Sequence, residues 1–245
     1  MLAAPGWVRK RGKGRVRVKI CGIRSADDAR IAVASGADAL GFLCGLDYPT
    51  SDQLDPAAAR QIIAGLPPFV SSVLVTHRTE IAWVAQACRE AACTTVQLHG
   101  DFHLEEIPAL RGPAPYLRII KAVHVVDRSA IGQALAAAQW ADAVLLDSRT
   151  ATRLGGTGVT HDWSISAEIV KETPKPVILA GGLNPENVQR AIRTVQPFAV
   201  DVNSGVKNSG GGKSPEKVAA FIRNAKAALG RVENLAPAES RLLAR

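Results

Sequence analysis

Eight short apolar stretches, separated by Ala-rich segments with helical periodicity, constrain the fold of this chain more than any other feature. Apolar runs of five or six residues that alternate with longer helical segments predict parallel strands joined by crossover helices. Eight such units in 245 residues predict an α/β protein with one domain, a closed (β/α)₈ or TIM barrel. The expected strands cover residues 16–21, 39–44, 72–76, 95–99, 117–122, 143–147, 177–181 and 198–202.

An open, doubly wound sheet is the alternative arrangement of alternating strands and helices. Such a sheet usually has fewer strands, and a G-x-G-x-x-G motif follows its first strand. Here the first expected strand is followed by GIRSAD (22–27), which does not match that motif. We therefore expect a barrel over residues 15–229, with a basic, disordered leader (1–14) and a loose C-terminal tail (230–245).

The basic charge of the chain is concentrated at its start. The net charge is +8, but six Lys or Arg residues and no acidic residue lie within the first 18 positions. We interpret this segment as a solvated leader rather than a nucleic-acid contact. No apolar run approaches the roughly 20 residues of a membrane helix, and the four cysteines lack CxxC spacing. The expected protein is cytoplasmic, with reduced thiols and no membrane partner; the sequence does not specify its oligomeric state.

Glycine-containing segments follow the last two expected strands. The seventh ends in Gly181-Gly182, and the eighth is followed by Ser204-Gly205. In barrels of this kind the loops after strands seven and eight commonly bind phosphate through backbone N–H groups. Either glycine segment alone could simply form a tight turn. Two on adjacent strands predict a phosphate site at Gly181, Gly182, Ser204 and Gly205.

Several polar residues are expected at the carboxyl rim of the barrel, where active sites of this fold lie. Side chains alternate along a strand, so Arg17, Lys19 and Cys21 should face inward together. Gln97 and His99 share one orientation on the fourth strand. Further polar residues close the fifth, sixth and eighth strands: Lys121, Asp147 and Asp201.

Each of these residues has a catalytic and a structural interpretation. Cys21 is a candidate base or nucleophile if neighbouring charge helps to ionise it, and otherwise a small buried residue. Asp147 is a candidate general acid if burial raises its pKa, and otherwise an ion-pair partner for Lys19 or Lys121. His99 is more often a structural hydrogen-bonding residue than a catalyst.

Six segments resemble phosphoribosylanthranilate isomerase, and the likeness extends from about residue 16 to 228. They are VKICGI (18–23), GADALGF (36–42), VQLHG (96–100), GGTG with DW (155–158 and 162–163), AGGLNPENV (180–188) and DVNSGV (201–206). Together, and in this order, they are far more specific than any one of them alone.

The resemblance implies an Amadori rearrangement in tryptophan biosynthesis, without cofactor or metal. The substrate would be a small phosphorylated sugar amine. By the resemblance, Asp147 is the general acid that opens the sugar ring and Cys21 is the general base that removes the proton from C2. It places Asp201 near the substrate amine, with Gly182 and Ser204 in the phosphate loops.

Two segments depart from the family pattern on the side where the aromatic half of the substrate is expected. The family carries an Arg after the second strand that is thought to pair with the anthranilate carboxylate. Residues 43–59 contain no Lys or Arg, and Asp52 falls at about that position. On the third strand Thr76 stands where the family tends to have Phe. We count Asp52, Thr76 and His99 among the candidate substrate-binding residues, and Arg24, Arg78 and Arg149 as possible replacements for the missing cation.

Three hypotheses follow from this pattern. The first is the phosphoribosylanthranilate isomerase reaction itself. The second is the same aminoaldose-to-aminoketose chemistry on a phosphoribosyl amine that lacks the carboxylate. The third is a non-catalytic barrel that binds a phosphorylated ligand, and the presence of both Cys21 and Asp147 disfavours it.

Overall fold

The computed structural model describes residues 15–150, 153–154 and 160–229. The expected leader (1–14), the expected tail (230–245) and the GGTG motif (155–158) lie outside the described residues.

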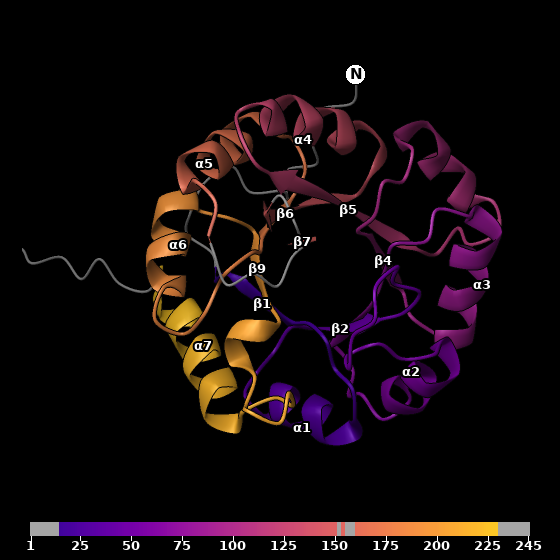
Figure 1. Cartoon of the computed structure of the whole chain (residues 1–245), viewed down its shortest axis with the longest axis horizontal. Helices are drawn as coiled ribbons and strands as arrows, with labels where there is room; N and C mark the ends of the chain where they lie inside the picture. The colour runs from indigo at the N-terminus through magenta and orange to yellow at the C-terminus, as the bar shows by residue number, and fades with distance from the viewer. Residues whose placement is uncertain (1–14, 151–152, 155–159, 230–245) are drawn as a thin grey trace, which may run out of the picture.

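A closed ring of eight parallel strands forms the centre of the molecule (Figure 1). Each strand pairs with its neighbour along the ring, and pairing of the fifth with the sixth closes it. The expected (β/α)₈ barrel is therefore confirmed. Its strands are β1 (Arg17–Ile20), β2 (Ala39–Leu43), β3 (Ser71–Thr76), β4 (Thr95–Leu98), β5 (Arg118–Val125), β6 (Ala143–Thr150), β8 (Val177–Leu179) and β9 (Ala199–Val202). The two-residue β7 (Arg153–Leu154) pairs antiparallel with the end of β6 and is not part of the ring.

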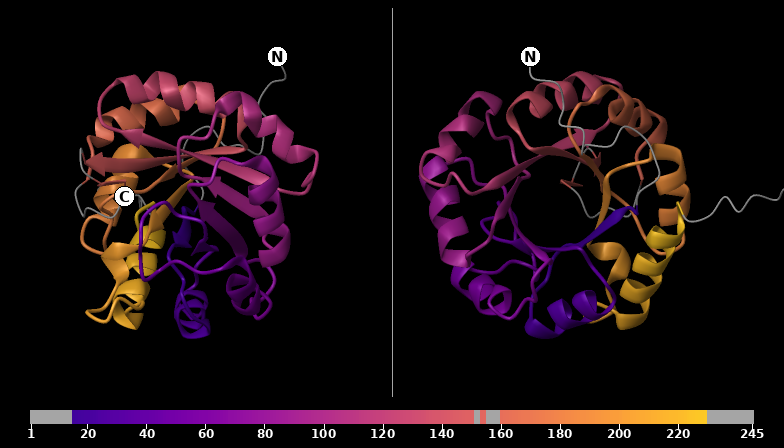
Figure 2. Two further views of the ribbon diagram at one scale, coloured as in Figure 1. Left: turned by 45° about the vertical axis from the view of Figure 1, so that its right-hand side comes forward. Right: turned by 180° about the vertical axis from the view of Figure 1, so that it is seen from behind.

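Helices surround the strand ring in all views of Figures 1 and 2. After β4 the connection contains a 3₁₀ helix, η1 (Leu104–Arg111), with Pro108 inside it. None of the described helices is long and apolar enough to cross a lipid bilayer. The α-helices are α1 (Ala26–Ala34), α2 (Pro56–Ile63), α3 (Ile81–Ala91), α4 (Ser129–Trp140), α5 (Trp163–Glu172), α6 (Val188–Val195) and α7 (Pro215–Ala227), and a second short 3₁₀ helix, η2 (Ser204–Val206), follows β9.

Alternation along the strands divides the apolar residues between two cores. Val18 and Ile20 of β1 belong to the larger core between strands and helices. Cys21 packs in the smaller core inside the ring, together with residues such as Val75 and Leu145. The expected orientation of the first strand is thus confirmed, because period-two alternation assigns each residue to one face.

The fifth strand is longer than the sequence predicted. The apolar run was expected to end at 122, but β5 continues to Val125, where His124 pairs in register with Asp147 of β6. Lys121 was expected at the rim, whereas it lies in the middle of the strand. Its neighbours Ile120 and Ala122 are the residues that face the inside of the ring. The Nζ of Lys121 instead donates to the carbonyl of Gly100.

Candidate active site

A pocket opens at the carboxyl ends of the barrel strands, where the sequence placed the polar rim. Of the candidate residues, those that line it are Cys21, His99, Asp147, Gly181, Gly182, Asp201 and Ser204. Three candidates, Asp52, Thr76 and Gly205, do not line the pocket.

Cys21 lies beside a buried ion pair that joins the first and last strands. Lys19 pairs in register with Asp201, and its Nζ is 2.8 Å from Asp201 Oδ2. Burial raises the pKa of the Cys21 thiol, and the Lys19 ammonium offsets this only in part. Burial alone would lower the pKa of Lys19, but Asp201 and Cys21 outweigh it and raise the pKa. A charged lysine is therefore held where it stabilises a thiolate when Cys21 loses its proton.

Gly41 on β2 leaves the space that this arrangement needs. A Cβ atom at this position would lie 2.7 Å from Cys21 Sγ and 3.0 Å from Lys19 Nζ. Those distances are shorter than van der Waals contact, so a side chain here would displace the thiol or the ammonium. Gly41 is within the GADALGF segment but was not among the predicted site residues.

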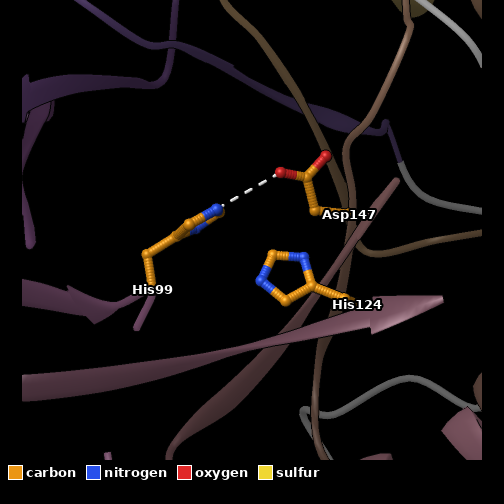
Figure 3. Close-up of side chains that lie close together, drawn as sticks. All are labelled: His99, His124 and Asp147. Atoms are coloured by element: carbon orange, nitrogen blue, oxygen red, sulfur yellow. Dashed lines mark ion pairs between the residues drawn. The ribbon is translucent and has the colours of Figure 1, made fainter. Parts of the chain in front are cut away.

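Asp147 faces Cys21 across the pocket, and His99 is its ion-pair partner rather than Lys19 or Lys121. His99 Nε2 lies 3.3 Å from Asp147 Oδ2 (Figure 3). The backbone N–H of Ser148 donates to Asp147 Oδ1 at 2.8 Å. Burial would raise the pKa of Asp147, as the sequence suggested, but His99, His124 and the Ser148 N–H outweigh it and lower the pKa. The free protein therefore holds Asp147 as a carboxylate.

The two glycine loops meet at one end of the pocket. Gly181 and Gly182 have φ values of 82° and 65°, in the left-handed region that favours glycine. A Cβ on Gly181 would lie 2.2 Å from Ser148 Oγ, and one on Gly205 would lie 2.1 Å from the Leu183 carbonyl oxygen. Gly205 thus joins the loops to each other without reaching the pocket.

Backbone donors remain available in these loops. Within the described part of the chain, the N–H groups of Gly182 and Ser204 donate no hydrogen bond to another protein group. Both residues line the pocket. Free N–H groups on two converging loops are suited to an anionic ligand such as phosphate.

Asp52 is placed differently from the expected substrate contact. Its side chain is buried and accepts hydrogen bonds from Lys207 Nζ at 2.7 and 2.5 Å and from Asn203 Nδ2 at 3.0 Å. This ion pair connects the loop after β2 to the segment that follows β9. The expectation that Asp52 faces the substrate therefore needs correction, because its carboxylate is already bound within the protein.

Thr76 also turns away from the pocket. Its hydroxyl donates to the Gly45 carbonyl at 3.2 Å and accepts from the Arg78 N–H at 3.1 Å, so it fixes the loop after β3. Arg78 packs over the Trp83 ring, and Arg24 lies 3.5 Å from Asp28. Within the described chain, no Lys or Arg lines the pocket.

The sequence did not reveal a row of rings, of which Tyr48, His77 and His99 line the pocket and His124 does not. Tyr48 lies 5.4 Å from His77, His77 stacks on His99 at 5.6 Å, and His99 meets His124 edge-on at 5.3 Å between ring centroids. Tyr48 is in an irregular loop and gave no periodic signal. The alternation of Ala122, Val123, His124 and Val125 would have indicated the inward orientation of His124.

The family model for N-(5'-phosphoribosyl)anthranilate isomerase matches residues 18–224 of the chain, a span that runs from the second residue of β1 to residue 224 in α7. The chain belongs to the phosphoribosylanthranilate isomerase family.

Similar family members come from archaea and bacteria. The chain is 41% identical to N-(5'-phosphoribosyl)anthranilate isomerase 2 of Methanosarcina mazei, over 90% of this chain and 98% of the relative. It is 44% identical to the isomerase of Geobacter metallireducens, over 86% of this chain and all of the relative.

Solved structures of phosphoribosylanthranilate isomerase share the fold. The enzyme of Thermotoga maritima superposes with a TM-score of 0.76 at 39% identity and covers 86% of this chain and 99% of its own. A further structure of the isomerase contains reduced 1-(o-carboxyphenylamino)-1-deoxyribulose 5-phosphate, and it matches with a TM-score of 0.72 at 38% identity, over 86% of this chain and 99% of its own.

Proposed function

We propose that this chain catalyses the Amadori rearrangement of N-(5-phosphoribosyl)anthranilate to the corresponding carboxyphenylamino-deoxyribulose phosphate, a step of tryptophan biosynthesis. One observation carries the assignment of roles. Cys21 after β1 and Asp147 on β6 face one pocket, and the two glycine loops lie at its end. An acid and a base on opposite sides of a sugar can act on two atoms of the same molecule.

In the first step Asp147 protonates the ring oxygen, and the amine lone pair forms the Schiff base as the ring opens. The lowered pKa of Asp147 requires that its proton be shared with a neighbour. The 3.3 Å contact between His99 Nε2 and Asp147 Oδ2 supports such sharing. His99 is then a positioning residue, whose Nε2 contacts the Asp147 carboxyl.

In the second step the Cys21 thiolate removes the proton from C2, and the resulting enol tautomerises to the ketone. Lys19 stabilises the thiolate. Asp201 Oδ1 is buried and has no hydrogen-bond partner in the described part of the chain. Because Asp201 lines the pocket, this oxygen can accept a hydrogen bond from the substrate amine, which supports its predicted position.

The phosphate is expected at the N–H groups of Gly182 and Ser204, and the aromatic ring against Tyr48 and His77. Because no Lys or Arg of the described chain lines the pocket, a phosphoribosyl amine without the carboxylate is the second candidate substrate. We expect an enzyme that acts in the cytoplasm on a small phosphorylated sugar amine.

Turnover and growth test the proposal together. The gene should restore growth to a tryptophan auxotroph that lacks this isomerase, and purified protein should convert the anthranilate substrate. Cys21→Ala and Asp147→Asn should each abolish turnover, whereas Cys93→Ala, a buried cysteine outside the pocket, should retain it. Soluble protein could fail both assays but convert N-(5-phosphoribosyl)aniline, the analogue of the substrate without the carboxylate. That result would favour the second candidate substrate. Phosphate-ligand binding without any turnover would indicate a non-catalytic barrel.

A further inference from the structure

Two imidazole rings and a carboxylate converge from neighbouring parts of the barrel (Figure 3); His99 and Asp147 line the pocket, and His124 lies beside them outside its lining. His99 follows β4, His124 is on β5 and Asp147 is on β6. One ligand atom from each of the three lies within 4.8 Å of the other two. We call these residues the His–His–Asp cluster.

The spacing within the cluster fits a small transition-metal ion. Zinc binds imidazole nitrogen and carboxylate oxygen at about 2.0–2.2 Å, so two tetrahedral ligands stand roughly 3.3–3.5 Å apart. His99 Nε2 and Asp147 Oδ2 are 3.3 Å apart. The nearest His124 nitrogen lies within 4.8 Å of both of these atoms. Two imidazoles and one carboxylate are a donor set that suits zinc better than magnesium or calcium.

The surroundings hold two of the ligands in place. The Ser148 N–H binds Asp147 Oδ1 at 2.8 Å and leaves Oδ2 directed at His99. Gln97 Nε2 lies 3.0 Å from His99 Nδ1, while Gln97 Oε1 is buried and has no partner in the described residues. Rotating this amide by half a turn would let Oε1 accept a proton from His99 Nδ1, which leaves Nε2 unprotonated and ready to bind a metal. Metal-binding histidines ordinarily donate their other N–H to such an acceptor.

We propose that the His–His–Asp cluster binds one Zn²⁺ ion and that bound zinc inhibits the enzyme. The inhibition rests on the proposed function, because the metal would bind the Asp147 oxygen that has to carry the proton to the sugar. It would also bind the His99 nitrogen that shares this proton. Three protein ligands leave one coordination position free for water or substrate on the pocket side.

Zinc titration of the full-length, tag-free protein tests the site without substrate. We expect the protein to compete with a chromogenic chelator for one equivalent of zinc. His124→Asn should weaken this zinc binding more than tenfold. His103→Asn changes an exposed histidine outside the pocket and is the matched control. Thermal melts of metal-free proteins establish that both variants are folded. Equal zinc affinity in wild type and His124→Asn would overturn the proposal, as would binding that is lost only in Cys21→Ser.

Turnover separates the site from the function. Metal-free wild type should convert substrate, lose at least tenfold in rate at saturating zinc, and recover fully with EDTA. Zinc at the same concentration should inhibit the His103→Asn control to the same extent. Zinc binding without any turnover by metal-free protein would contradict the proposed function and leave the site standing. Full activity of the zinc-saturated enzyme would refute the inhibition.

Discussion

Replacing Asp52 by alanine distinguishes an internal anchor from a substrate contact. Asp52 is 1% exposed, and its carboxylate binds Lys207 and Asn203. Removing one partner of a buried ion pair costs roughly 3–5 kcal/mol, because the other charge is left without a partner. The Lys207 side chain is 21% exposed and can turn to water, so we expect the lower end of this range.

Asp52→Ala should therefore lower the free energy of unfolding by about 3 kcal/mol. Asp52→Asn keeps an acceptor for Asn203 and should cost less, about 2 kcal/mol. In a double-mutant cycle with Lys207→Met, the two residues should couple by at least about 1 kcal/mol.

Equilibrium urea unfolding measures these changes as a lower midpoint at unchanged slope. Steady-state kinetics on the same samples measures KM, which a residue that binds substrate directly would control. A loss of stability below about 1 kcal/mol, combined with a clear change in KM for Asp52→Ala, would refute the anchor and restore the substrate contact.

Three further substitutions test the geometry around the pocket. Gly41→Ala places a methyl group 2.7 Å from Cys21 Sγ, so kcat should fall at least tenfold. Overpacking should also lower the free energy of unfolding by about 1–3 kcal/mol. An unchanged kcat would show that the thiol has room to move. Lys19→Gln removes the charge that lowers the pKa of Cys21, so this pKa rises further. The rising limb of kcat/KM against pH should therefore move to higher pH. A limb that stays in place would show that Lys19 does not influence the base. Gly181→Ala adds a side chain at a φ of 82° against Ser148, and it should lower Tm and abolish the stabilisation that a sugar phosphate gives to wild type; retained stabilisation would place the phosphate elsewhere.

The sequence was sufficient for those parts of the site that regular structure positions. Strand alternation placed Lys19 and Cys21 inside the ring, and the same rule paired Gln97 with His99 on one face. Apolar strand runs also located the barrel itself. These features depend on local pattern, which a single sequence displays directly.

Features that depend on distant contacts were not visible. Asp52 looked like an unpaired acid in a loop without cations, yet its partner Lys207 lies 155 residues further along the chain. From the sequence, burial was the only effect considered, and it would raise the pKa of Asp147. In the folded protein His99 and His124 reverse this shift and lower the pKa. Such pairings are set by barrel closure and register, and strand pattern alone does not specify which side chains meet.

The ion pair between Lys19 and Asp201 links residues that are 182 positions apart and belong to the first and last strands of the ring. Cys21 belongs to the early half of the barrel, and Asp147 to the late half. Neither half alone contains both members of this proposed acid–base pair, so a chain whose barrel is not closed cannot complete the reaction. Recovery of activity during refolding therefore reports the joining of the two halves, which helix content measured by circular dichroism would not distinguish.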